Sequence, residues 1–273
     1  MIERIFVFFF GVCFGSFLNV CIYRLPKDKS VILPRSFCPH CNQSLKWYDN
    51  IPVISFMALR GKCRFCKEKI SFRYPLVELI TAVLILVLYI QFGISLLFVK
   101  LAFLFCILIV VSFIDIDYHA IPAYLCVLGI ITGLIMSLAE SVSMFKDGIT
   151  PLGKLPVMGA WYGLIAGLGF TYLFKLFGDF FINIYLTLRK KDSIEGERES
   201  LGLGDVDFMG MIGAFLGIKV AILVFFIAPF IAIVYSIFAI IFKKSHLIPY
   251  LPYLSLATLV VFFWGDVILR IIF

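Results

Sequence analysis

Long apolar runs separated by short polar segments occupy most of this chain. Runs such as 76–114 and 220–242 are apolar on every face and lack the alternation of a membrane β-strand. About 20 apolar residues form a helix that crosses a bilayer. The pattern therefore predicts an all-α polytopic membrane protein with about eight transmembrane helices. We expect these spans at 2–22, 76–92, 96–114, 121–139, 157–178, 206–218, 220–242 and 252–272.

The sixth predicted span is short and rich in glycine. Its separation from the seventh, at Gly217–Lys219, depends on one lysine in an otherwise apolar run. No internal repeat with a fixed period is visible along the chain.

Composition agrees with this class. The 273 residues are 62% hydrophobic and 15% charged, which excludes a soluble globular domain and a disordered chain. The net charge of +7 points to cytoplasmic loops rather than to nucleic acid, because basic loops of membrane proteins face the cytoplasm.

One polar segment dominates the charge distribution. Residues 24–73 contain eleven Lys or Arg and three acidic residues. The positive-inside rule therefore predicts that this segment is cytoplasmic and that the N-terminus lies outside. A cleaved signal peptide is the alternative for the first run, but no small-residue cleavage site follows it. We expect three parts, with residues 1–23 as the first transmembrane helix, 24–75 as a small cytoplasmic loop domain that contains four cysteines and 76–273 as a membrane bundle.

Two C-x2-C pairs lie in this cytoplasmic segment. The four cysteines are Cys38, Cys41, Cys63 and Cys66. Two such pairs can hold a tetrahedral zinc ion through four thiolates, with no position left for water, so a structural ion is predicted. Two disulfides are the alternative, which a reducing cytoplasm disfavours. His40 lies between two of the cysteines and is an alternative ligand, although a surface position is the simpler interpretation.

Acidic residues mark the ends of two predicted spans. Asp115 and Asp117 end the third span, while Asp205 and Asp207 open the sixth. Ionisable groups at membrane spans are costly and often functional. Two neighbouring carboxylates can share a proton and activate water for peptide hydrolysis, as aspartyl proteases do. Gly202 and Gly204 permit backbone that bulkier residues cannot adopt.

An ordered series of motifs covers nearly the whole chain. In chain order, it includes Gly15-Ser16-Phe17-Leu18-Asn19-Val20, Tyr23-Arg24-Leu25-Pro26, Trp47-Tyr48-Asp49-Asn50-Ile51-Pro52, Phe72-Arg73-Tyr74-Pro75 with Glu78, Ile114-Asp115 and Gly202-x-Gly204-Asp205. In this series the chain resembles the prepilin leader peptidases of type IV pilus and type II secretion systems. These are membrane aspartyl proteases that are also N-methyltransferases.

The resemblance implies a function and assigns residues to it. Asp115 and Asp205 would be the catalytic pair that removes the basic leader of a prepilin or pseudopilin. The enzyme would then methylate the new N-terminal residue with S-adenosylmethionine. Asn19, Arg24 and Glu78 match positions associated with methyl transfer or substrate. The resemblance also implies a location in the bacterial cytoplasmic membrane, with the zinc loop and the aspartates on its cytoplasmic side.

Two positions depart from the family pattern. Asp207 stands where the family commonly has lysine, and Ala123 follows Pro122 where aspartate is usual. Neither change removes the expected aspartate pair. For Asp117 and Asp207 we favour pairing with a nearby lysine or snorkelling to the membrane interface.

Three alternatives remain at this level. A peptidase without methylation would leave the four-cysteine loop without its expected use. A proton- or cation-coupled transporter with a zinc-ribbon loop predicts repeated or broken helices in two halves of the chain. A non-enzymatic adaptor would leave the aspartate motifs without a role. We expect membrane lipid and pilin-like substrates as partners and no nucleic acid, and the sequence does not give the oligomeric state or the pilin clients.

Overall fold

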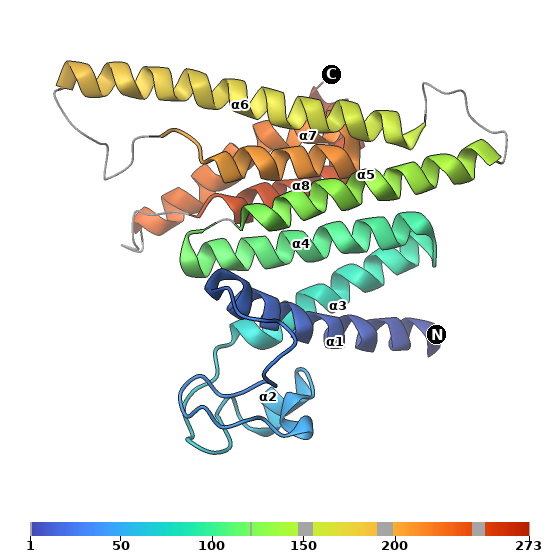
Figure 1. The fold of residues 1–273 in the computed structure, drawn as a ribbon, viewed down its shortest axis with the longest axis vertical. Helices are drawn as coiled ribbons and strands as arrows, with labels where there is room; N and C mark the ends of the chain where they lie inside the picture. Colours follow the sequence, from blue (N-terminus) through green and yellow to red (C-terminus); the bar gives the residue numbers. More distant parts are fainter. Residues whose placement is uncertain (1, 121, 147–154, 190–198, 242–248, 273) are drawn as a thin grey trace. The chain divides into compact units, whose positions relative to one another are not determined.

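The computed structural model describes residues 2–120, 122–146, 155–189, 199–241 and 249–272. The chain packs into two units, Met1–Ala120 and Ile121–Phe273, drawn from blue to teal and from green to red in Figure 1. Residues 121 and 242, each at one end of a predicted span, lie outside the described part.

The first unit combines three long helices with an irregular loop. The helices are α1 (Ile2–Arg24), α3 (Arg73–Phe92) and α4 (Leu96–Tyr118). The side chain of Ser95 caps α4 by accepting a hydrogen bond from the Phe98 N–H, 3.1 Å away. Between α1 and α3, the loop carries only short elements, η1 (Leu25–Lys27), η2 (Trp47–Asn50) and α2 (Ile54–Ala58).

The second unit is built from the remaining helices. They are α5 (Ala123–Lys146), α6 (Pro156–Arg189), α7 (Leu203–Ile241) and α8 (Leu251–Ile272). The predicted fifth span was placed at 157–178, but α6 continues as a helix to Arg189.

Helices α6 and α7 approach at their backbones. A methyl group at Gly163 would lie 2.1 Å from the Gly213 carbonyl oxygen, and one at Gly167 would lie 2.3 Å from that of Met209. Small residues permit such contact between membrane helices, where packing rather than water drives association.

We expect Gly163→Ala to destabilise the detergent-solubilised protein by about 1–3 kcal/mol, because overpacking separates α6 from α7. Gly169→Ala is the matched control, since a methyl group there meets nothing within 4 Å. Thermal unfolding of both variants checks this prediction. An unchanged midpoint for Gly163→Ala would show that the helices do not need this close approach.

Helix α7 is interrupted at Gly217, whose φ of 81° and ψ of 177° are not helical. Gly217 lies near Gly159 at the start of α6. Eight residues further on, the Phe225 ring lies 4.8 Å from that of Phe174, about four turns along α6 from Gly159. The chain therefore reverses at Gly217, and Figure 1 shows α7 as two arms.

Among the described residues, seven helices are long and apolar enough to cross a membrane. The predicted sixth and seventh spans are the two arms of α7, so the total of seven and the predicted total of about eight differ only in how α7 is counted. The prediction of an all-α polytopic membrane protein is confirmed.

Candidate functional site

The loop of the first unit folds its cysteines into two similar knuckles. In one, the Cys38 N–H donates to the Gln43 carbonyl and the Asn42 N–H donates back to the Cys38 carbonyl, at 3.0 and 2.8 Å. The second repeats the pattern, with Cys63 N–H donating to the Glu68 carbonyl at 2.8 Å and Lys67 N–H donating to the Cys63 carbonyl at 3.1 Å. Asn42 and Lys67 both have positive φ, which closes each turn.

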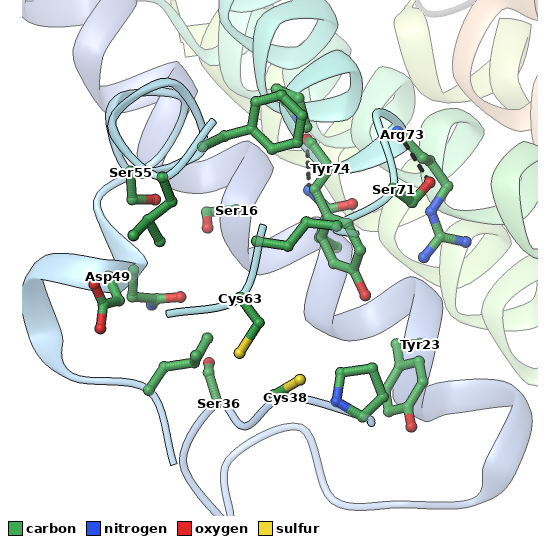
Figure 2. A pocket seen from close by; sticks show the side chains of 18 of the residues that line it. Ser16, Tyr23, Ser36, Cys38, Asp49, Ser55, Cys63, Ser71, Arg73 and Tyr74 are labelled. Atoms are coloured by element: carbon green, nitrogen blue, oxygen red, sulfur yellow. Dashed lines mark hydrogen bonds between the residues drawn. The ribbon is translucent and has the colours of Figure 1, made fainter. Parts of the chain in front are cut away.

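The two knuckles bring all four cysteine sulfurs within 4.8 Å of one another. The Cys38 and Cys66 sulfurs are 3.9 Å apart, and Figure 2 shows the Cys38 and Cys63 side chains pointing toward each other from separate segments. Four sulfurs around a tetrahedral zinc ion lie about 3.8 Å apart, since each Zn–S bond is about 2.3 Å. The cluster therefore fits a four-coordinate metal ion, and His40 is not part of it.

The charges of these thiols also suit a cation. Hydrogen bonds, led by the one from the Cys66 backbone N–H, lower the pKa of Cys63 to about 7. The Glu68 backbone N–H lowers the pKa of Cys66, but desolvation and the other three thiols outweigh it and raise that pKa to about 12. One thiolate thus forms readily while further negative charge is opposed, and a bound divalent ion would relieve that repulsion.

A cavity of about 460 Å³ lies in the first unit, lined mainly by the loop and by residues at the ends of α1 and α3 that adjoin it. This volume is typical of a small-molecule site. Figure 2 shows its lining, with Ser16 on α1, Tyr74 at the start of α3, and Cys38 and Cys63 on the loop. Asn19, Arg24 and Glu78, which the sequence singled out, all line it.

Close packing of α1 against α3 positions Glu78 at the cavity. A methyl group at Gly15 would lie 2.7 Å from the Glu78 Cα, so the two helices touch where Glu78 faces the cavity. Glu78 is 7% exposed, and its carboxylate accepts a hydrogen bond from the Val53 N–H at 2.8 Å. The backbone of the loop is thereby tied to α3 at the cavity.

Asn19 is 3% exposed, and only one of the two polar atoms of its side chain is hydrogen-bonded. Its Nδ2 donates to the Tyr74 carbonyl at 3.0 Å, whereas its Oδ1 has no hydrogen-bond partner. A buried unsatisfied acceptor costs about 1–3 kcal/mol. A ligand with an N–H or O–H group in the cavity would remove that cost.

Arg24 has a different environment from the other two. Its guanidinium donates to the Ser30 carbonyl at 2.9 Å and to the Pro34 carbonyl at 2.7 Å. Arg24 thus fastens the start of the loop to the end of α1. Arg24 lines the cavity, but its donors serve the loop, and its role in methyl transfer or substrate binding stays a prediction.

Two further acidic residues lining the cavity are paired with arginines. Asp49 accepts from Arg64, with a closest distance of 2.6 Å, and Asp117 forms an ion pair with Arg73. Asp117 pairs with a basic group, as expected from the sequence, although the partner is arginine. Its neighbour Asp115 is buried in the last turns of α4, where its carbonyl accepts from the His119 N–H at 2.9 Å.

In the second unit, Asp205 lies in the first turn of α7. Its Oδ2 accepts from the Gly202 N–H at 3.1 Å, and its own N–H donates to the Gly202 carbonyl at 3.1 Å. A carboxylate that accepts from the N-cap N–H is half of a capping box, so Asp205 helps to start α7. Asp207 follows within the same turn and is partly exposed. Asp115 and Asp205 belong to different units, and their pairing stays a prediction.

Sequence reasoning missed a polar cluster beside the Gly202–Asp205 segment. Lys175 on α6 forms ion pairs with Asp179 at 3.1 Å and with Glu199 at 2.5 Å. The only signal was a lone lysine inside a long apolar run, which is also typical of a residue at the membrane interface.

Two family models match consecutive parts of the chain. The model described as Bacterial Peptidase A24 N-terminal domain matches residues 9–92, and that of the Type IV leader peptidase family matches residues 102–237. The first match contains the four cysteines and the cavity helices α1 and α3. The second contains both predicted catalytic aspartates.

Curated relatives carry one shared description, prepilin leader peptidase/N-methyltransferase. The protein of Myxococcus xanthus is 37% identical over 78% of this chain, and the match covers 56% of that protein. The protein of Aeromonas salmonicida is 30% identical over 97% of this chain and 91% of its own length. That of Bacillus subtilis is 28% identical, with 96% and 95% covered. No solved structure gives a significant match.

Proposed function

This chain belongs to the type IV leader peptidase family, and on that premise we propose that it removes the leader of prepilins or pseudopilins and then N-methylates the new N-terminus. Within this function, the first unit would carry methyl transfer and Asp115 with Asp205 would carry peptide cleavage. The observation that supports the division best is the cavity of the first unit, which the metal-binding loop and the buried Asn19 and Glu78 line together.

For cleavage, the proposed roles follow the chemistry of paired carboxylates. One of Asp115 and Asp205, as a carboxylate, takes a proton from water while the other, protonated, donates to the scissile carbonyl. Both residues lie near helix ends, which would face the cytoplasm if the basic loop of the first unit is cytoplasmic. Water and a membrane-embedded substrate helix meet at that boundary. Extended substrate backbone there needs hydrogen-bond partners from protein.

For methyl transfer, we propose that the cavity of the first unit binds the methyl donor, S-adenosylmethionine, and the new N-terminal amine. The donor supplies an electrophilic methyl group. The N-terminal ammonium must first lose a proton, and among the carboxylates that line the cavity Glu78 is the buried one that is not paired with an arginine. The Asn19 Oδ1 would accept a hydrogen bond from the amine or from the donor, which supports its placement in this site.

We expect Glu78→Gln to lower methylation by about 100-fold and to leave leader cleavage active, because the amide keeps the shape but cannot take the proton. Mass spectrometry of mature pilin, reading the addition of one methyl group, measures this. Glu3→Gln is the matched control, since Glu3 is exposed at the other end of α1. Full methylation by Glu78→Gln would remove Glu78 from the reaction.

The zinc ion is proposed as a structural element of the loop, held by Cys38, Cys41, Cys63 and Cys66. Four sulfur ligands leave no open position for a reacting water, so the ion would hold the two knuckles together rather than act on substrate. The loop lines the cavity, and the ion would thereby support methyl transfer indirectly.

The proposed location is the bacterial cytoplasmic membrane, with the loop and the aspartates on the cytoplasmic side. The chain is a multi-pass membrane protein by its helices. Its basic loop would lie against anionic lipid headgroups, which attract lysine and arginine within a Debye length.

Incubation of the detergent-solubilised protein with a full-length prepilin tests the whole proposal. We expect a shortened pilin without methyl donor, and a product heavier by one methyl group when S-adenosylmethionine is added. Cleavage without any methylation would leave the peptidase-only alternative. No cleavage of several prepilins by folded protein would contradict the proposal.

A further inference from the structure

A buried lysine connects α6 to the chain segment that immediately precedes the G-x-G-D motif. Lys175 is 6% exposed. Its ammonium group contacts three acceptors, the Glu199 carboxylate at 2.5 Å, the Leu201 carbonyl at 2.8 Å and the Asp179 carboxylate at 3.1 Å. An ammonium group has three hydrogens, so its bonding capacity is filled within this cluster.

Asp179 also binds the segment 199–201, through two contacts with Ser200. Its Oδ1 accepts from the Ser200 N–H at 2.7 Å and lies 2.8 Å from the Ser200 hydroxyl oxygen. Gly178 leaves the space for this contact, because a methyl group there would lie 2.5 Å from the Ser200 side chain. Residues 199–201 are therefore fixed to α6 through both backbone and side-chain groups.

The fixed segment leads directly to Asp205. Lys175 holds the Leu201 carbonyl, and the next residue, Gly202, donates its N–H to the Asp205 carboxylate at 3.1 Å. The Leu201 carbonyl and the Gly202 N–H belong to the same peptide group. One peptide group, with a hydrogen bond on each side, thus connects the ammonium group to the carboxylate. Because Gly202 has no side chain to anchor it, the contacts at residues 199–201 determine how this turn enters α7.

The three contacts of Lys175 do not contribute equally. The Glu199 side chain is 64% exposed, so its ion pair is screened by water and contributes little. The Leu201 carbonyl and Asp179 are the partners that a buried ammonium group needs, because an unpaired buried charge is strongly unfavourable.

We propose that Lys175, together with Asp179, is a positioning residue for peptide cleavage, which orients the Asp205 carboxylate through Leu201 and Gly202. This rests on the proposed catalytic role of Asp205. In this proposal a buried lysine lies beside the G-x-G-D motif. The chain has Asp207 at the position after the motif where the family commonly has lysine. A misplacement of a catalytic group by about 1 Å can lower a rate by about 100-fold.

The test compares Lys175→Met and Lys175→Arg in prepilin cleavage. We expect Lys175→Met to lower kcat by about 100-fold with KM little changed, since the substrate-binding surface is untouched. Lys175→Arg keeps a cation for Asp179 and the Leu201 carbonyl, and should recover much of that loss. Methylation of an already cleaved pilin should stay normal in both, because the first unit is unaltered.

Lys219→Met is the matched control, since Lys219 is an exposed lysine on α7 beyond the Gly217 reversal. Wild-type kcat in Lys175→Met, or an equal loss in Lys175→Arg and Lys175→Met, would overturn the positioning role. If Lys175→Met also loses methylation and so fails to fold, Asp179→Asn decides the question, and normal kcat there overturns the proposal.

Asp205→Asn is measured in parallel. Persistent cleavage by that variant contradicts the proposed catalytic role of Asp205, whereas its inactivity beside a fully active Lys175→Met contradicts only the positioning role.

Discussion

Asp115→Asn and Asp205→Asn should each lower prepilin cleavage by more than about 100-fold, because an amide can neither take a proton from water nor hold the shared one. Both substitutions preserve side-chain size, and the amide oxygen introduced by Asp205→Asn can still accept from the Gly202 N–H that the carboxylate now engages. The fold should therefore survive. Cleavage of a purified prepilin in detergent, followed on a gel and by mass spectrometry, gives the rate.

The controls for this result are the neighbouring acidic residues. Asp117→Asn removes the ion pair with Arg73, and Asp207→Asn changes a partly exposed carboxylate in the first turns of α7. Both variants should keep substantial cleavage. Loss of activity in Asp117→Asn but not in Asp115→Asn would reverse our choice within the first motif. Methylation of a pre-cleaved pilin should continue in Asp115→Asn, Asp205→Asn and Asp207→Asn, whose residues do not line the cavity, and this separates lost catalysis from lost folding.

Removal of the metal should abolish methylation. We expect about one zinc ion per chain in the purified protein, and its loss in Cys63→Ser or after chelation. A structural zinc site typically contributes about 10–16 kcal/mol of binding free energy, which is folding free energy for a small loop. Without the ion, the two knuckles that line the cavity should separate. Elemental analysis measures the ion, and limited proteolysis of 25–72 measures the loop.

Cys13→Ser is the matched control, because Cys13 is an exposed cysteine on α1 that lies outside the four-sulfur cluster. It should leave zinc content and methylation unchanged. Normal methylation by metal-free protein would exclude a structural role for the ion. A zinc content near zero in the wild-type protein would contradict the metal assignment itself.

Several features followed from the sequence alone. Continuous apolar runs can satisfy their backbone hydrogen bonds in a bilayer only as helices or closed barrels, and the lack of alternation left helices. The spacing of the two C-x2-C pairs predicted a metal-binding loop, since each pair makes its own local turn. These are short-range patterns, and the structure agrees with both of them.

The predicted positions of the helix ends were less accurate. The sequence analysis predicts that one span ends at 178, but α6 extends to Arg189, because residues 179–189 are still largely apolar and contain neither glycine nor proline to end the helix. The reversal at Gly217 was expected from a single lysine, and the structure supports it through contacts of Phe225 with α6.

What the sequence determined by itself is the class of the protein, its metal-binding loop and the motifs of its family, because these depend on local pattern. Only the tertiary structure brought Asn19 and Glu78 to one cavity, through the contact of Gly15 with α3. Only the tertiary structure joined Lys175 to residues 199–201. Such contacts depend on which helix faces pack together, and in a chain that is apolar on every face the sequence pattern does not mark those faces.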